Sequence, residues 1–70
     1  MNRYAIIIEK ANGNYSAYVP DVPGCIATGK SIEETRQKLI DALEGHLELM
    51  RQAGEPIPQP STVTEYVEVI

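Results

Sequence analysis

A turn stiffened by two prolines, over residues 20–24, constrains this sequence more than any other feature. Pro20 and Pro23 each hold φ at about −65° and lack an N–H, so neither fits a central strand of a sheet. The pair Pro23-Gly24 supplies the negative and then positive φ that a type II turn requires. The runs on either side, residues 15–19 and 25–28, are rich in strand-forming residues. The sequence therefore predicts two strands that pair antiparallel across this turn.

Two further strands are predicted near the ends of the chain. Residues 3–10 form an apolar run, and residues 63–70 alternate valines with polar side chains. The Asn12-Gly13 pair between the first run and the second is a strong signal for a type I′ hairpin turn, which needs positive φ at both positions. We therefore expect the first two strands to form a hairpin and residues 63–70 to form the last strand.

One helix is predicted over residues 31–53. Ser31 opens a capping box in which its hydroxyl accepts from the N–H of Glu34, while the Glu34 carboxylate reaches back to the N–H of Ser31. Gly54 fits the left-handed position that closes a helix, and the prolines of residues 55–61 indicate a stiff connector. The apolar stripe at helical spacing consists of Ile32, Leu39, Leu43, Leu47 and Met50, with Ile40 and Ala53 at its edge.

These elements predict a single domain over residues 1–70 of the α+β class, in the order β-β-β-α-β. The helix and connector are long enough to return the chain parallel to the first strand, and such crossovers are right-handed. The simplest arrangement is a mixed four-stranded sheet of order 3-2-1-4 with the helix on one face. The other face then carries apolar side chains from several strands. Since soluble monomers rarely expose a large apolar patch, we expect that face to meet another protein, most simply a second copy.

Charge and composition narrow the classes of partner. The chain has ten acidic and six basic residues, for a formal net charge of −4. A strongly basic stripe, the usual footprint of nucleic-acid binding, is absent from the sequence. No apolar run approaches the ~20 residues that a membrane span needs, and the N-terminal residues do not form a signal peptide. We therefore expect a cytoplasmic protein with a basic protein as its partner.

The residues able to do chemistry are few and scattered. His46 lies within the helix without an acid or nucleophile on its face, and Cys25 has the pattern of a packed small hydrophobe. A two-metal nuclease needs converging carboxylates, but Glu9, Asp21 and Asp41 lie far apart in the predicted fold. We expect no catalytic residue, metal or cofactor. Gly45 within the helix has two possible explanations: the helix simply tolerates a glycine at this position, or the backbone of another segment or chain approaches closely there.

Several motifs in a fixed order carry a family resemblance. Tyr-x-Ala-x-Val-Pro-Asp-x-Pro-Gly-Cys starts at Tyr15, and Ala-Thr-Gly follows at residues 27–29. Ser-x-Glu-Glu starts at Ser31, and Gly-Glu-Pro-Ile-Pro-x-Pro starts at Gly54. In this order the motifs resemble the HicB family, the antitoxins of HicA–HicB toxin–antitoxin pairs, over roughly residues 3–70. Family members have a truncated ribonuclease H-like fold, so the resemblance implies a partial fold of that kind here.

The resemblance also implies a function. A HicB-like antitoxin would neutralise a small, basic, mRNA-cleaving HicA-type toxin by occluding its active site, without doing chemistry itself. We expect the partner-binding residues to include Tyr18, Asp21, Val22 and Pro23, with Asp21 foremost. Many members continue into a DNA-binding domain, whereas this sequence stops at Ile70, so direct DNA binding is not expected from this chain alone. The alternatives are a stand-alone oligomer with another binding function and a degenerate ribonuclease H-like nuclease.

Overall fold

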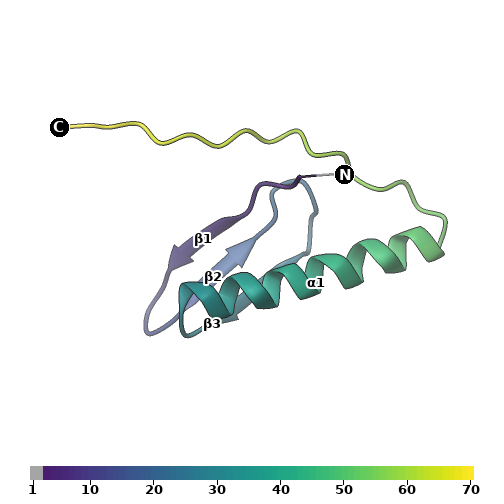
Figure 1. The fold of residues 1–70 in the computed structure, drawn as a ribbon, viewed down its shortest axis with the longest axis horizontal. Coiled ribbons are helices and arrows are strands. Elements are labelled where there is room, and N and C mark those ends of the chain that lie inside the picture. The colour runs from purple at the N-terminus through teal and green to yellow at the C-terminus, as the bar shows by residue number, and fades with distance from the viewer. Residues whose placement is uncertain (1–2) are drawn as a thin grey trace.

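A computed structural model describes residues 3–70 and shows a three-stranded antiparallel sheet with a helix across one face (Figure 1). The strands are β1 (Ile7–Lys10), β2 (Tyr15–Tyr18) and β3 (Ile26–Gly29), paired in the order β1-β2-β3, and the helix is α1 (Ile32–Gln52). The three sequential strands and the helix are therefore confirmed. Met1 and Asn2, at the start of the predicted domain, lie outside the described residues.

Both hairpin connections form, but only one has the predicted turn type. Across the proline-rich turn, the N–H of Cys25 donates to the carbonyl of Val22 at 3.2 Å, and Gly24 has φ +86°. This hydrogen bond and this φ are those of a type II turn. In the first hairpin, Gly13 has φ +78°, whereas no residue other than glycine among those described has a positive φ. The type I′ prediction was therefore wrong, because Asn12 stays in the ordinary negative-φ region.

The ends of α1 lie close to their predicted positions. The Ser31 hydroxyl accepts from the N–H of Glu34 at 3.0 Å, as the capping box requires. The Glu34 carboxylate instead accepts from the N–H of Lys30 at 3.2 Å, one residue earlier than predicted. This hydrogen bond, followed by the contact with Lys38, lowers the pKa of Glu34. At the other end Gly54, with φ +74°, closes α1 in a Schellman motif: its N–H donates to Arg51 and the next N–H donates to Met50.

The hydrophobic core lies between α1 and the face of the sheet that α1 covers. Leu39 is the fully buried member of the helix stripe, while Leu43 and Leu47 pack against the core from its edge. Ile32 is 40% exposed, which is more than its place in the predicted stripe implies. The buried hydrophobic residues are Ala17, Val19, Val22, Cys25 and Leu39. The core is small, so every buried side chain matters to stability.

The predicted fourth strand is not formed, and this corrects the fold class. Residues 63–70 are extended and exposed, and the sheet described within residues 3–70 contains β1, β2 and β3 only. The order is therefore β-β-β-α, and the mixed sheet 3-2-1-4 with its partial ribonuclease H-like fold was wrong. The physical reason lies in the proline-rich connector: the Tyr4 hydroxyl donates to the carbonyl of Pro58, and the chain then passes outside β1 (Figure 1). We call residues 63–70 the tail.

Two glycines, Gly29 and Gly45, differ in the space around them. A Cβ at Gly29 would lie 2.6 Å from the Thr35 hydroxyl oxygen and 2.9 Å from the Thr35 nitrogen, so β3 approaches α1 as only glycine allows. Thr35 cannot yield easily, because it is buried and its hydroxyl donates to the Ser31 carbonyl at 2.7 Å. Around Gly45, by contrast, a Cβ would meet no atom of the described residues within 4 Å.

We expect Gly29→Ala and Gly45→Ala to change stability in opposite directions. Gly29→Ala should destabilise by about 1–3 kcal/mol through overpacking against Thr35. Gly45→Ala should stabilise by up to about 1 kcal/mol, because alanine loses less conformational freedom in a helix. Urea unfolding of each variant at one protein concentration measures both effects. Equal destabilisation by the two substitutions would contradict the close approach of β3 to α1.

Candidate protein-binding surface

A row of apolar side chains crosses the sheet face opposite α1. In the antiparallel register Ile7 pairs with Tyr18, and Tyr18 pairs with Ile26. Directly paired residues project from the same face, and this face is opposite to that of the buried Ala17. Tyr18 is 41% exposed and Ile26 is 69% exposed. No other helix or strand in the described part of the chain covers these side chains. We call them the apolar row.

Polar residues bound the apolar row on one side. Two positions further along the strands, Glu9 pairs with Ser16 and Ser16 pairs with Thr28. Because side chains two residues apart share a face, these groups stand beside the apolar row on the same open surface. An apolar centre with a polar margin is the usual anatomy of a protein-binding surface. The sequence predicted that apolar residues would gather on this face, and the register shows which ones.

The proline-rich turn lies at the end of the apolar row, because it joins Tyr18 to the start of β3. Of the residues predicted to bind a partner, Tyr18 and Pro23 lie at the surface. Val22 is 1% exposed and packs in the core, so within one chain it supports the turn from beneath. Asp21 is partly exposed, and its carboxylate already has partners within the chain. Tyr18 and Pro23 thus remain at the surface, whereas Asp21 and Val22 have contacts within the chain.

The Asp21 carboxylate holds the connector that follows α1. One oxygen accepts from the backbone N–H groups of Ser61 and Thr62, each at 3.0 Å. The other accepts from the Ser61 hydroxyl at 3.1 Å and the Thr62 hydroxyl at 2.7 Å. The N–H of Thr62 contributes most to lowering the pKa of Asp21 from 3.8 to about 2. We call this contact the latch. The latch joins residues 40 positions apart in the sequence. No local sequence pattern indicates such a contact, so the sequence did not predict the latch.

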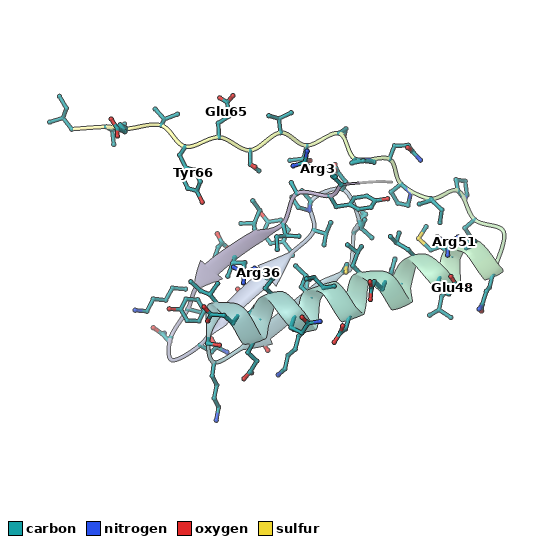
Figure 2. All side chains as sticks on the ribbon, viewed as in Figure 1. Arg3, Arg36, Glu48, Arg51, Glu65 and Tyr66 are labelled. Carbon is teal, nitrogen blue, oxygen red and sulfur yellow. The ribbon has the colours of Figure 1, made fainter. Side chains whose placement is uncertain are left out.

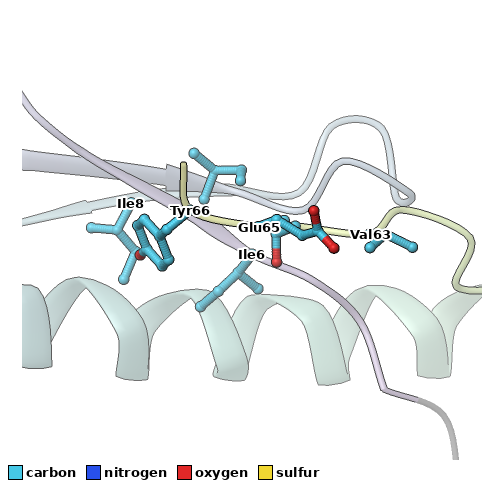
Figure 3. A pocket seen from close by; sticks show the side chains of 7 residues that line it. Ile6, Ile8, Val63, Glu65 and Tyr66 are labelled. Carbon is cyan, nitrogen blue, oxygen red and sulfur yellow. The ribbon is translucent and has the colours of Figure 1, made fainter. Parts of the chain in front are cut away.

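Beyond the latch, the tail runs past the outer edge of β1 without joining the sheet. Figure 2 shows Tyr66 pointing toward the sheet and Glu65 pointing away from it. Between the tail and β1 lies a groove of about 450 Å³. Its lining comes from both segments: Ile6, Ile7, Ile8, Val63, Thr64, Glu65 and Tyr66. The side chains labelled in Figure 3 come from both walls of the groove: Ile6 and Ile8 from the segment of β1, and Val63, Glu65 and Tyr66 from the tail.

The remaining residues with side chains that could take part in catalysis or metal binding include Cys25 and His46. Cys25 is buried in the core, and this burial raises the pKa of its thiol. His46 is half-buried on α1. Within residues 3–70, no three His, Cys, Asp or Glu side chains are grouped so that they could hold a metal ion. Over the same residues, no helix has both the length and the apolar character to cross a membrane.

Comparison with known proteins gives one consistent family. Residues 4–69 match the model of the HicB-like antitoxin of bacterial toxin–antitoxin systems. An uncharacterised 14.9 kDa protein of Haemophilus phage HP1 is 36% identical over 64 residues, covering 91% of this chain and 48% of that protein. Antitoxin HicB 1 of Photorhabdus laumondii is 33% identical over 69 residues, covering 96% of this chain and 44% of that antitoxin. This chain thus spans about half the length of either relative.

A solved structure resembles this fold as well. A chain of the HicA3 and HicB3 toxin–antitoxin complex superposes with a TM-score of 0.71 and 28% sequence identity. The match covers 86% of this chain and 70% of that chain. The arrangement of strands and helix described above therefore occurs in a protein that has been solved as part of such a complex.

The latch predicts a simple response to acid. Because the pKa of Asp21 is below its ordinary value, the latch stabilises the attached connector fully above pH 3.8 and loses its effect as the pH falls toward about 2. In an NMR titration, the amide signals of Ser61 and Thr62 should move with a midpoint near this low value. In Asp21→Asn the movement should vanish, because the amide that replaces the carboxylate does not titrate in this pH range. Asp41→Asn, a change at an exposed helix aspartate, serves as control and should leave both signals unchanged.

Proposed function

Because the chain belongs to the family of HicB-like antitoxins of bacterial toxin–antitoxin systems, we propose that it binds a HicA-type toxin and neutralises it by covering the toxin's active site. The observation that carries this proposal is the exposed apolar row on the sheet face opposite α1. Contiguous apolar residues at the surface of a small protein mark a site for another protein. The name of Antitoxin HicB 1 and the complex to which the similar solved chain belongs support a toxin as that protein.

Net charge supports the same partner. The chain carries −4, and a HicA-type toxin, which acts on RNA, has a basic surface by family resemblance. Opposite charges speed the encounter of two proteins and select their relative orientation. Around the apolar row, Glu9 supplies an acidic margin on the open face. We therefore place the apolar row at the centre of the contact with the toxin and the acidic groups around it.

Binding alone accounts for the proposed activity. An antitoxin that covers an active site excludes the RNA substrate by volume and needs no catalytic group of its own. Tyr18 and Pro23 form the exposed end of this surface, and Asp21 acts through the latch that organises the turn beneath them. We further propose that the chain works in the cytoplasm, where an mRNA-cleaving toxin would act, and that it associates with itself. The nuclease alternative needs converging carboxylates, and no such group of three occurs among residues 3–70.

A pair of matched variants tests the role of the apolar row. Ile26 on the open face is 69% exposed and Leu49 on α1 is 67% exposed, so Asp at either position should leave folding nearly unaffected. If Ile26 is an interface anchor worth about 2 kcal/mol or more, Ile26→Asp should weaken toxin binding roughly 30-fold. Leu49→Asp should bind as the native chain does. Titration calorimetry with a HicA-type toxin measures both affinities.

Growth of cells that express the toxin provides the functional readout. The native chain and Leu49→Asp should restore growth, whereas Ile26→Asp should restore it poorly. Failure of the native chain to bind the toxin and to restore growth would overturn the antitoxin proposal. Native affinity and full rescue by Ile26→Asp would move the binding site away from the apolar row.

A further inference from the structure

The proline-rich turn is held on its inner side by the core and on its outer side by the latch. Val22 is buried in the core. Two backbone hydrogen bonds close the turn: the N–H of Val22 donates to Val19 at 3.0 Å, and the N–H of Cys25 donates to Val22 at 3.2 Å. On the outer side, the Asp21 carboxylate forms the latch, and Pro23 beyond it is exposed. The position of the exposed tip thus depends on the core and on the latch together.

The connector that supplies the donors of the latch is itself firmly placed. It begins at Gly54, where the Schellman motif closes α1. Farther along, the Tyr4 hydroxyl donates to the carbonyl of Pro58. The three prolines within residues 55–61 restrict the backbone of the connector. A stiff segment that is attached at its start, its middle and its end acts as a brace, and this brace ends on the turn.

The four hydrogen bonds of the latch suit a carboxylate. Two backbone N–H groups donate to one oxygen and two hydroxyls donate to the other, over distances of 2.7–3.1 Å. Hydrogen bonds to an ionised acceptor are stronger than those between neutral groups. Because all four donors belong to the adjacent residues Ser61 and Thr62, we expect these bonds to form and break together. An open latch leaves the turn and the connector free to move relative to one another.

We propose that Ser61 and Thr62 are positioning residues for toxin binding: through the latch they hold the turn in the form that the toxin contacts. The turn joins Tyr18 directly to Ile26, and these two residues of the apolar row pair with one another. A surface that is ordered before binding loses less conformational entropy on binding, so its affinity is higher. The latch therefore raises toxin affinity without touching the toxin. This inference rests on the proposed function and adds the residues that support its surface from the connector.

The same contact acts in the opposite direction. If a closed latch raises toxin affinity, bound toxin must favour the closed latch by the same factor, because binding and closing are thermodynamically linked. The latch lies directly before the tail, so bound toxin also fixes the point from which the tail departs. The N–H groups of Ser61 and Thr62 donate to Asp21, so their hydrogen exchange reports how often the latch opens.

A double-mutant cycle tests the role of the latch. Ser61→Ala/Thr62→Ala removes both hydroxyl donors, and Asp21→Ala removes the acceptor. We expect each change to weaken binding of the HicA-type toxin by roughly three- to tenfold, the effect of lost order rather than of a lost anchor. The combined variant should bind no more weakly than Asp21→Ala, because the same contact cannot be lost twice. Titration calorimetry measures the four affinities.

Two matched variants serve as controls. Ser61→Thr/Thr62→Ser keeps both hydroxyl groups at the latch and should bind as the native chain does. Thr64→Ala removes a hydroxyl of the tail that takes no part in the latch, and its affinity should also be native. In the native chain, the amides of Ser61 and Thr62 should exchange more slowly when the toxin is bound. In Asp21→Ala this slowing should be lost.

Additive losses in the combined variant would overturn the proposal, because the hydroxyls would then contact the toxin directly. Native affinity in Ser61→Ala/Thr62→Ala or in Asp21→Ala would overturn it as well. So would latch amides whose exchange the toxin leaves unchanged. In each of these cases a native chain that binds the toxin still supports the proposed function, whereas a native chain that does not bind the toxin overturns both.

Discussion

The packing of α1 against one face of a small sheet is the contact on which the whole structure depends. Leu39 is fully buried against Ala17 and the turn residues, and Gly29 lets β3 approach the first turn of α1. One helix can shield only one face of a sheet. The opposite face keeps its apolar row, and the outer edge of β1 keeps its open backbone groups, throughout the described residues. The surface that we assign to a partner follows from this one-sided core.

The proline-rich turn has a second role beyond joining β2 to β3. Its buried residue, Val22, belongs to the core, while its acidic residue forms the latch. Through the latch the turn sets the path of a connector that begins at the far end of α1. Two rigid segments, each stiffened by proline, thus meet at the Asp21 carboxylate. The position of the tail beside β1 is a consequence of this meeting.

The two open surfaces differ in what they can recognise. The apolar row has the acidic residue Glu9 at its margin and suits a folded partner of opposite charge. The groove between β1 and the tail presents backbone groups in line, so it suits an extended strand.

Local sequence signals determined the secondary structure. The Ser31 cap, the Gly54 end and the Pro23-Gly24 turn were all predictable, because each depends on residues a few positions apart. To identify the residues of the apolar row, only the register of the two hairpins was needed in addition. Only the tertiary structure decided whether the tail joins the sheet. Its sequence pattern is typical of a strand, but pairing depends on the path of the connector that precedes it. That path is set by the contact of Asp21 with Ser61 and Thr62, which joins residues far apart in the sequence.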